Sequence, residues 1–145
     1  MSKPIIAIGN DHTACEFRKP IIEYLAKNGY KVLDLGTKNC NPVDYPDFGN
    51  KTAQAILDGK AQLGIIICGT GIGISIAANR LHGIRCALVY EEETTRLAKQ
   101  HNNANMIALG ARIISPYKAV EIVKVFLDTK SSTEQRHIER IKKLD

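Results

Sequence analysis

The sequence predicts an α/β protein in which one parallel β-sheet is enclosed between helices. Short apolar runs rich in β-branched residues alternate with longer stretches that have the period of a helix. The strand candidates are apolar at consecutive positions, as expected for a parallel sheet covered on both faces. At 145 residues the chain has the size of one compact domain, so we expect a single domain over residues 1–145.

Five strands are expected, and each is an apolar run bounded by polar residues or glycine. They cover residues 4–9, 30–36, 63–68, 84–90 and 105–110. In an open parallel sheet, ligands bind beyond the carboxyl ends of the strands, where the winding direction reverses. The residues that directly follow each strand are therefore the first candidates for a functional site.

Helices are expected between these strands and after the last one. They cover residues 14–28, 48–58, 73–81, 91–101, a segment from Pro116 onward and about 132–143. Gly29, Gly59 and Gly83 follow the first three helices, and glycine commonly terminates helices. The second helix is expected to start just after Pro46. Ser115 and Pro116 are a capping residue and a proline at the first helical position.

Composition excludes several classes of protein. The N-terminal segment MSKPIIAIGNDH has too few apolar residues for a signal peptide or a membrane span, so we expect no membrane partner and a cytoplasmic location. The net charge is +5, but the basic residues are scattered singly and aromatic residues are few, so we expect no nucleic-acid partner. An acidic small molecule, above all a phosphate, stays compatible with the charge.

The four cysteines of the chain are expected to be free thiols. Cys15, Cys40, Cys68 and Cys86 are far apart in sequence and form no C-x-x-C pair. We therefore expect no metal site and no dithiol redox centre. Cys15 is expected to serve core packing.

Residues 65–80, IIICGTGIGISIAANR, carry the strongest chemical signal. Cys68 ends a buried strand just before a helix, where unpaired amides and the helix dipole would stabilise a thiolate, so it is a candidate base or nucleophile. The alternative is a small buried apolar residue. Gly69, Gly71 and Gly73 let main-chain amides approach an anion, and Thr70 adds a hydroxyl. The stretch matches neither the G-x-G-x-x-G dinucleotide pattern nor a G-x-x-x-x-G-K phosphate loop.

Polar residues elsewhere in the chain are weaker candidates for site residues, because most of them also have an ordinary structural explanation. Asp11 and His12 follow the first strand, which usually neighbours the third, so they could face Cys68; Asp11 could instead cap the next helix. His101 lies at a helix end, where histidine is common, beside amides that suit sugar hydroxyls.

Arg136 and Arg140 are four residues apart and share one helix face, which suits a phosphate. The alternative for this arginine pair is a solvated basic face, paired with Glu134 or Glu139.

Taken together, these stretches resemble the B-type ribose-5-phosphate isomerase family, which also includes allose- and galactose-6-phosphate isomerases. The stretches that carry the resemblance are GNDH after the first strand, DYPD at 44–47, ICGTGIGISIAANR, QHNNAN at 100–105, ALGAR at 108–112 and RHIER near the end. They extend over essentially the whole chain. In place of the small residue and glycine that commonly follow the Asp-His pair of this family, the chain has Thr13 and Ala14.

The resemblance implies a Rossmann-like three-layer sandwich with strand order 2-1-3-5-4 and a C-terminal helix. It implies a homodimer, or a dimer of dimers, with active sites shared between subunits and with neither metal nor cofactor. Cys68 would be the base, with Thr70 and the amides of Gly69, Gly71 and Gly73 around the enediolate oxygen. The remaining roles that it implies are ring opening by Asp11 and His101, phosphate binding by His12, Arg112, Arg136 and Arg140, and sugar contacts by Tyr45 and Asn102.

The expected activity is an aldose–ketose isomerisation of D-ribose 5-phosphate and D-ribulose 5-phosphate through a cis-enediol, in the non-oxidative pentose phosphate pathway. The alternatives are a hexose-6-phosphate isomerase, specific for allose or galactose 6-phosphate, and a sugar-phosphate or nucleotide sensor without catalysis. The presence of Cys68, Thr70 and His101 in one chain favours an enzyme over a sensor.

Overall fold

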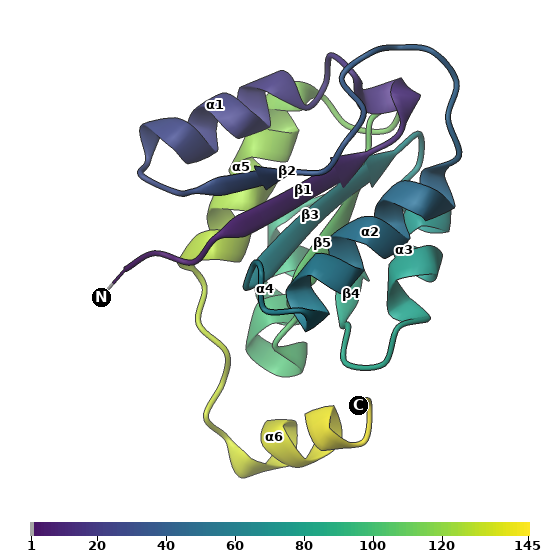
Figure 1. Cartoon of the computed structure of the whole chain (residues 1–145). Coiled ribbons are helices and arrows are strands. Elements are labelled where there is room, and N and C mark those ends of the chain that lie inside the picture. The colour runs from purple at the N-terminus through teal and green to yellow at the C-terminus, as the bar shows by residue number, and fades with distance from the viewer. Residues whose placement is uncertain (1) are drawn as a thin grey trace.

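Five parallel strands form one sheet between two layers of helices in the computed structural model, which describes residues 2–145 (Figure 1). The strands are β1 (Ile6–Asn10), β2 (Val32–Asp34), β3 (Leu63–Cys68), β4 (Cys86–Leu88) and β5 (Met106–Gly110). Their order is β2-β1-β3-β5-β4, and every neighbouring pair is parallel. The predicted fold class and strand order are confirmed.

The register of the central strands brings three carboxyl ends side by side. Asn10 of β1 pairs with Ile67 of β3, and Cys68 pairs with Gly110 of β5. The chain leaves β1 toward β2 on one side, and β3 lies on the other side, so the winding direction reverses between β1 and β3. The residues after β1 and β3 therefore lie at the position where such sheets bind ligands.

Six α-helices cover or extend the sheet: α1 (Lys19–Lys27), α2 (Tyr45–Leu57), α3 (Ile72–Asn79), α4 (Glu92–Asn102), α5 (Pro116–Asp128) and α6 (Gln135–Lys142). Helices α2 and α3 pack together on one face, whereas α5 packs against α1 and α4 on the other. Helix α6 follows an extended segment and lies beyond the sandwich, next to α4 (Figure 1). None of the helices among residues 2–145 is long and apolar enough to cross a bilayer.

Three helices start three or more residues away from the predicted position; the last of them, expected from about residue 132, starts at Gln135. The helix expected from residue 14 starts at Lys19, because His12–Ala14 form the 3-10 turn η1 and residues up to 18 continue as turns. The helix expected after Pro46 starts one residue before it, at Tyr45. A proline in the first helical turn loses no hydrogen bond, because the amides of that turn have no partner within the helix.

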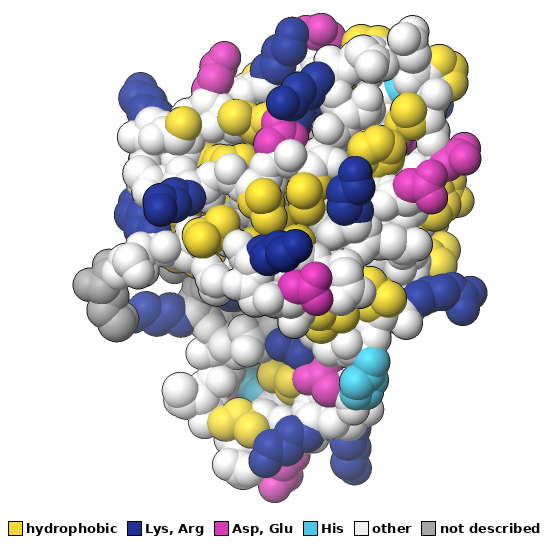
Figure 2. All heavy atoms as spheres, viewed as in Figure 1, with side chains coloured by type: hydrophobic (Ala, Val, Ile, Leu, Met, Phe, Trp, Pro, Cys, Tyr) yellow, Lys and Arg dark blue, Asp and Glu magenta, His cyan; other side chains and the backbone are white. Residues whose placement is uncertain are grey.

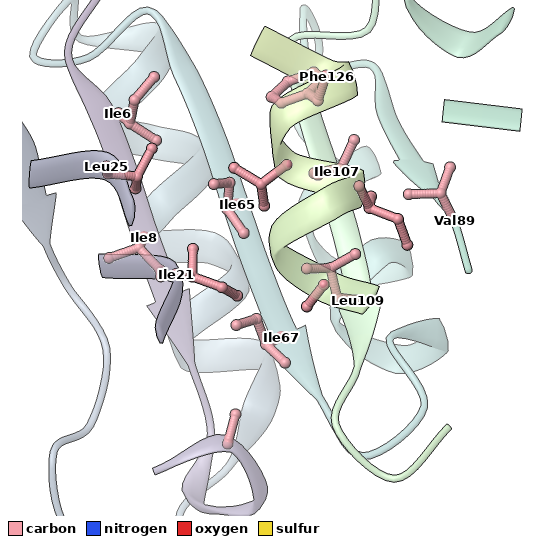
Figure 3. Packing of buried hydrophobic residues seen from close by; sticks show 14 of the residues in the cluster. Ile6, Ile8, Ile21, Leu25, Ile65, Ile67, Val89, Ile107, Leu109 and Phe126 are labelled. Atoms are coloured by element: carbon pink, nitrogen blue, oxygen red, sulfur yellow. The ribbon is translucent and has the colours of Figure 1, made fainter. Parts of the chain in front are cut away.

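Both faces of the central strands are apolar, which explains their continuous apolar sequence. Ile8, Ile65 and Ile107 point toward the layer of α1 and α5, where they pack with Ile21 and Phe126 (Figure 3). The intervening residues, among them Cys68, pack against α2 and α3. The side chain of Cys68 thus lies on the α3 side of the sheet.

On the face drawn in Figure 2, Lys and Arg side chains lie singly among acidic and apolar ones. This distribution agrees with the scattered basic residues of the sequence. The Lys and Arg side chains form no continuous basic stripe on that face.

Gly9 of β1 is in close contact with α2 and generates a stability prediction. A Cβ atom at this position would lie 1.9 Å from Oγ1 of Thr52 and 3.0 Å from the carbonyl oxygen of Phe48. We expect Gly9→Ala to lower the free energy of unfolding by about 1–3 kcal/mol, measured by urea denaturation, because the sheet and helix must separate. Adding Thr52→Ala removes the closest contact, so the double variant should recover part of this loss. Unchanged stability of Gly9→Ala would contradict the packing described.

Candidate active site

The turn after β3 holds a main-chain amide against the sulfur of Cys68. The amide of Gly71 donates a hydrogen bond to Cys68 Sγ at 3.1 Å, and the Cys68 residue is 5% exposed. Gly71 has a φ of 81°, and a Cβ atom there would lie 2.8 Å from Leu88 Cδ1 and 2.9 Å from the Leu109 backbone. A residue with a side chain fits neither the conformation nor the space, so this arrangement depends on glycine.

The same turn leaves further donors available for a ligand. The amide of Ile72 donates to Thr70 Oγ1 at 3.1 Å, so the hydroxyl acts there as acceptor and keeps its own proton to donate. The amides of Gly69, Thr70 and Gly73 donate to no atom of residues 2–145. Together with the start of α3, these groups form a positive environment next to the thiol.

Asp11 lies beside Cys68 and also caps η1. Its amide donates to the carbonyl oxygen of Ile67 at 3.1 Å, so the turn after β1 is joined to the end of β3. The amide and the hydroxyl of Thr13 both donate to Asp11 Oδ1, at 3.0 and 2.6 Å. The capping role that the sequence left open is therefore present, and the same residue lines the hollow described below.

His12 has a structural contact that the sequence did not indicate. The amide of Val43 donates to His12 Nδ1 at 3.1 Å. Because Nδ1 accepts this bond, the ring nitrogen that can donate a hydrogen bond is Nε2. Thr13 and Ala14 stand where the family commonly has a small residue and glycine, and both fit within η1. Ala14 is fully buried, and the Thr13 hydroxyl donates to Asp11.

A hollow of about 450 Å³ at the carboxyl end of the sheet collects most of the predicted site residues. It is lined by Asp11, His12, Thr13, Tyr45, Cys68, Gly69, Thr70, Ile72, Gly73 and Arg112. A Cβ atom at Gly69 would lie 3.4 Å from Arg112 Nη1, and one at Gly73 would lie 2.5 Å from Tyr45 Cε1. The guanidinium of Arg112 and the ring of Tyr45 thus lie directly over the glycine turn.

Four of the predicted residues lie at the opposite end of the sheet, namely His101, Asn102, Arg136 and Arg140. Helix α4 starts beyond the carboxyl end of β4 and runs back by about 16 Å over its 11 residues, so His101 lies near the amino end of the sheet (Figure 1). His101 and Arg136 line a second hollow of about 460 Å³. Asn102 lines a third, and Arg140 a fourth that it shares with Arg136. One chain alone does not bring these residues to Cys68.

Within the chain, α6 has the ion pair that the sequence left open as an alternative. Arg136 Nε donates to the carboxylate of Glu134 at 2.7 Å, and this hydrogen bond lowers the pKa of Glu134. Next to it, the rings of His101 and His137 are 4.6 Å apart between centroids. His101 is therefore part of a polar cluster between α4 and α6.

The prediction of four free thiols was wrong for two of them. Cys15 and Cys40 form a disulfide, with their Cα atoms 5.4 Å apart, whereas Cys68 and Cys86 are free. The long loop between β2 and α2 folds back over η1, so that distant residues meet, and no C-x-x-C spacing reveals this. Glu16 lies close enough to complete a three-ligand group, but the disulfide occupies both sulfurs. Burial raises the pKa of the Cys86 thiol, which keeps it protonated.

A buried polar network that no sequence motif indicates fixes the same loop between β2 and α2. Arg18 donates to Asn10 Oδ1 at 2.8 Å and to the carboxylate of Asp34. Asn10 Nδ2 donates in turn to the carbonyl oxygens of Asp11 and Thr37, both at 2.9 Å. The signal available in the sequence was a polar residue, Asn10, at the end of an otherwise apolar strand.

The chain is similar in sequence and structure to several sugar-phosphate isomerases. The model of the Ribose/Galactose Isomerase family matches residues 6–144. The chain is 43% identical to a galactose-6-phosphate isomerase subunit of Clostridium acetobutylicum, over 97% of this chain and 82% of that one. It is 45% identical to a D-erythrulose-4-phosphate isomerase of Pectobacterium atrosepticum, over 85% and 82% of the two chains. A solved ribose 5-phosphate isomerase of Thermotoga maritima superposes with a TM-score of 0.94 at 45% identity, over 98% and 97% of the two chains.

The disulfide generates a prediction about redox-dependent stability. A bond between residues 25 apart in sequence restricts the unfolded chain, so we expect reduction to lower the free energy of unfolding by about 3 kcal/mol. The measurement is urea denaturation with and without a phosphine reductant. The double variant Cys15→Ser, Cys40→Ser is the control, and its stability should not respond to the reductant. Alkylation of all four cysteines in air-oxidised, unfolded protein would contradict the pairing.

Proposed function

The chain belongs to the ribose/galactose isomerase family, and on this premise we propose that it interconverts D-ribose 5-phosphate and D-ribulose 5-phosphate with Cys68 as the base. The observation that carries the proposal is the turn after β3. It offers a thiol that accepts a hydrogen bond from Gly71, a hydroxyl at Thr70 and three amides without partners among residues 2–145, all within six residues. A base and an oxyanion site are the two parts that enolisation requires.

The proposed reaction moves one proton between neighbouring carbons. In the ring-opened aldose, C2 bears a weakly acidic hydrogen because C1 is a carbonyl. The Cys68 thiolate removes this proton, a C1–C2 double bond forms, and the carbonyl electron pair moves onto O1 to give the cis-enediolate. The proton of the O2 hydroxyl is transferred to O1, and return of the abstracted proton from Cys68 to C1 gives the ketose. The Thr70 hydroxyl and the free amides stabilise the negative oxygen formed on the way.

The phosphate is proposed to bind in the same hollow as the thiol, at His12 and Arg112. His12 offers an N–H donor at Nε2, and Arg112 offers a guanidinium fork suited to phosphate oxygens. Tyr45, which packs on Gly73, is proposed to contact the sugar.

A second copy of the chain is proposed to complete the site. His101, Asn102, Arg136 and Arg140 lie at the far end of the sheet from Cys68, so a site containing both groups needs residues from two chains. In this homodimer, or dimer of dimers, His101 would act with Asp11 in opening the furanose ring. The two arginines would add to the phosphate site.

A hexose 6-phosphate is the second candidate substrate. The relative from Clostridium acetobutylicum carries the name of a galactose-6-phosphate isomerase subunit, and the one from Pectobacterium atrosepticum that of a four-carbon phosphosugar isomerase. Ribose 5-phosphate is favoured because the highly similar structure from Thermotoga maritima bears that activity in its name.

A substrate panel tests the proposed reaction. We expect kcat/KM for ribose 5-phosphate to exceed the values for allose 6-phosphate and galactose 6-phosphate by about tenfold or more, since the hollow must fit the carbon chain between base and phosphate. Cys68→Ala should lower kcat by about a thousandfold, should stop exchange of the reactive hydrogen with deuterated water, and should leave phosphosugar binding within about twofold. Cys86→Ala, which alters the other free thiol, is the matched control and should stay active.

Two results of this panel would overturn the proposal. Binding of one phosphosugar without turnover of any would make the chain a sensor. Hydrogen exchange that persists in Cys68→Ala would assign the base to another residue.

Subunit mixing tests the shared site. Homodimers of Cys68→Ala and of His101→Ala should both be nearly inactive. When the two variants are unfolded together and reassembled at random, about half of the dimers are mixed, and each contains one intact site, so roughly a quarter of wild-type activity should return. If native mass spectrometry shows mixed dimers and activity stays absent, then Cys68 and His101 do not act in one site across two chains.

A further inference from the structure

One peptide group links Cys68 to a tyrosine on the neighbouring edge of the sheet. The peptide between Thr70 and Gly71 donates its N–H to Cys68 Sγ at 3.1 Å and accepts, at its carbonyl oxygen, the O–H of Tyr90 at 2.6 Å. A peptide group is planar and trans, so its N–H and its C=O point in opposite directions. Tyr90 and Cys68 are therefore the two ends of one chain of hydrogen bonds.

We propose that Tyr90 is a positioning residue for the thiol: its hydroxyl holds and polarises the peptide whose amide donates to Cys68. The catalytic meaning of this inference rests on the proposed function, in which Cys68 is the base. Tyr90 follows β4 and precedes α4, and neither its type nor its spacing belongs to the motifs of the sequence.

Among the residues that the structure describes, Tyr90 is the only side chain that bonds to a carbonyl oxygen of residues 68–71. The carbonyl oxygens of Cys68, Gly69 and Gly71 accept from the amides of Ala111, Arg112 and Ser75, at 2.9, 2.9 and 3.1 Å. Those three bonds form whatever side chains are present. The fourth carbonyl, that of Thr70, depends on the residue at position 90.

The Thr70 carbonyl is also confined from a second side. A Cβ atom at Gly110 would lie 2.7 Å from its oxygen, so the carbonyl lies directly against the β5 backbone at a position with no side chain. The next residue, Gly71, has a φ of 81°, a conformation open to glycine. Glycine can also adopt other backbone conformations, so the φ of Gly71 alone does not fix the peptide between Thr70 and Gly71. The Tyr90 hydroxyl keeps this peptide oriented with its N–H toward the sulfur.

Hydrogen bonds in series strengthen each other. A donor on the carbonyl of a peptide makes its N–H a stronger donor, by about 10–30% per bond in the condensed phase. The Tyr90 hydroxyl thus increases the stabilisation of negative charge on sulfur through a group that it does not touch. Its removal would weaken this stabilisation.

The variant Tyr90→Phe removes only the hydroxyl and provides the test. We expect kcat for the phosphosugar that the enzyme turns over to fall by about threefold to tenfold, with KM changed by less than about twofold, since Tyr90 does not line the hollow proposed to bind the substrate. Tyr24→Phe on α1, distant from the turn, is the matched control and should leave both constants unchanged.

Alkylation of the free enzyme separates this role from simple packing. The rate of iodoacetamide reaction at Cys68, followed by mass spectrometry of its peptide at neutral pH, should fall by about two- to threefold in Tyr90→Phe. A thiolate that is less stabilised by the Gly71 amide lowers the rate, and its higher nucleophilicity offsets only about half of that effect. A turn that is merely loosened would instead expose the buried sulfur and raise the rate.

Two outcomes would overturn the inference. A faster reaction at Cys68 in Tyr90→Phe would make Tyr90 a packing residue, and unchanged alkylation would show that no polarisation reaches the sulfur. The alkylation assay needs no turnover. It therefore decides the role of Tyr90 even if Cys68→Ala turns out to be active and the proposed function fails.

Discussion

The hydrogen bond from the Gly71 amide to the sulfur of Cys68 determines how the site at the carboxyl end of the sheet is built. It forms because β3 ends at a residue whose side chain faces α3 and is followed by a turn with a left-handed glycine. That turn uses the Gly71 and Ile72 amides internally and leaves three other donors beside the thiol. The direction of the Cys68 side chain, the left-handed backbone at Gly71 and the start of α3 therefore depend on one another. A change in any of them would remove the hydrogen bond to the sulfur.

The loop between β2 and α2, next to the Cys68 turn, is held by polar contacts that fix its position but add little to the free energy of unfolding. Arg18 and Asp34 form an ion pair whose arginine is almost fully buried, and such pairs contribute little net stability, because desolvation offsets their attraction. Together with Asn10 and the disulfide, this pair fixes the loop between β2 and α2. The same loop supplies the Val43 amide that leaves Nε2 as the donor nitrogen of His12. A buried network in this protein thus fixes which nitrogen of a candidate phosphate ligand can donate a hydrogen bond.

Features encoded by residues close together in the sequence could be predicted, and contacts between distant segments could not. Continuous apolar runs located the strands, because both faces of a central parallel strand are covered, and the turn after β3 was visible because its glycines are adjacent in sequence. The strand order came from the family resemblance. The pairing of Cys15 with Cys40, the Val43 contact of His12 and the Tyr90 bond to Thr70 each join segments 20 or more residues apart. Such contacts depend on how loops fold over the sheet, and no periodicity or spacing encodes them.

The division of residues between the two ends of the sheet bears on how one framework serves phosphosugars of different length. In the proposed reaction, bonds change only at C1 and C2, next to Cys68, whereas the phosphate is at the far end of the carbon chain. A sugar with one carbon more or less leaves the geometry at the thiol unchanged and moves the phosphate by about the length of a bond. Substrate choice would therefore depend on where His12, Arg112 and the arginines of α6 in a second chain meet the phosphate, and not on the glycine turn. The relatives named for four-, five- and six-carbon substrates are compatible with one catalytic turn combined with differently placed phosphate ligands.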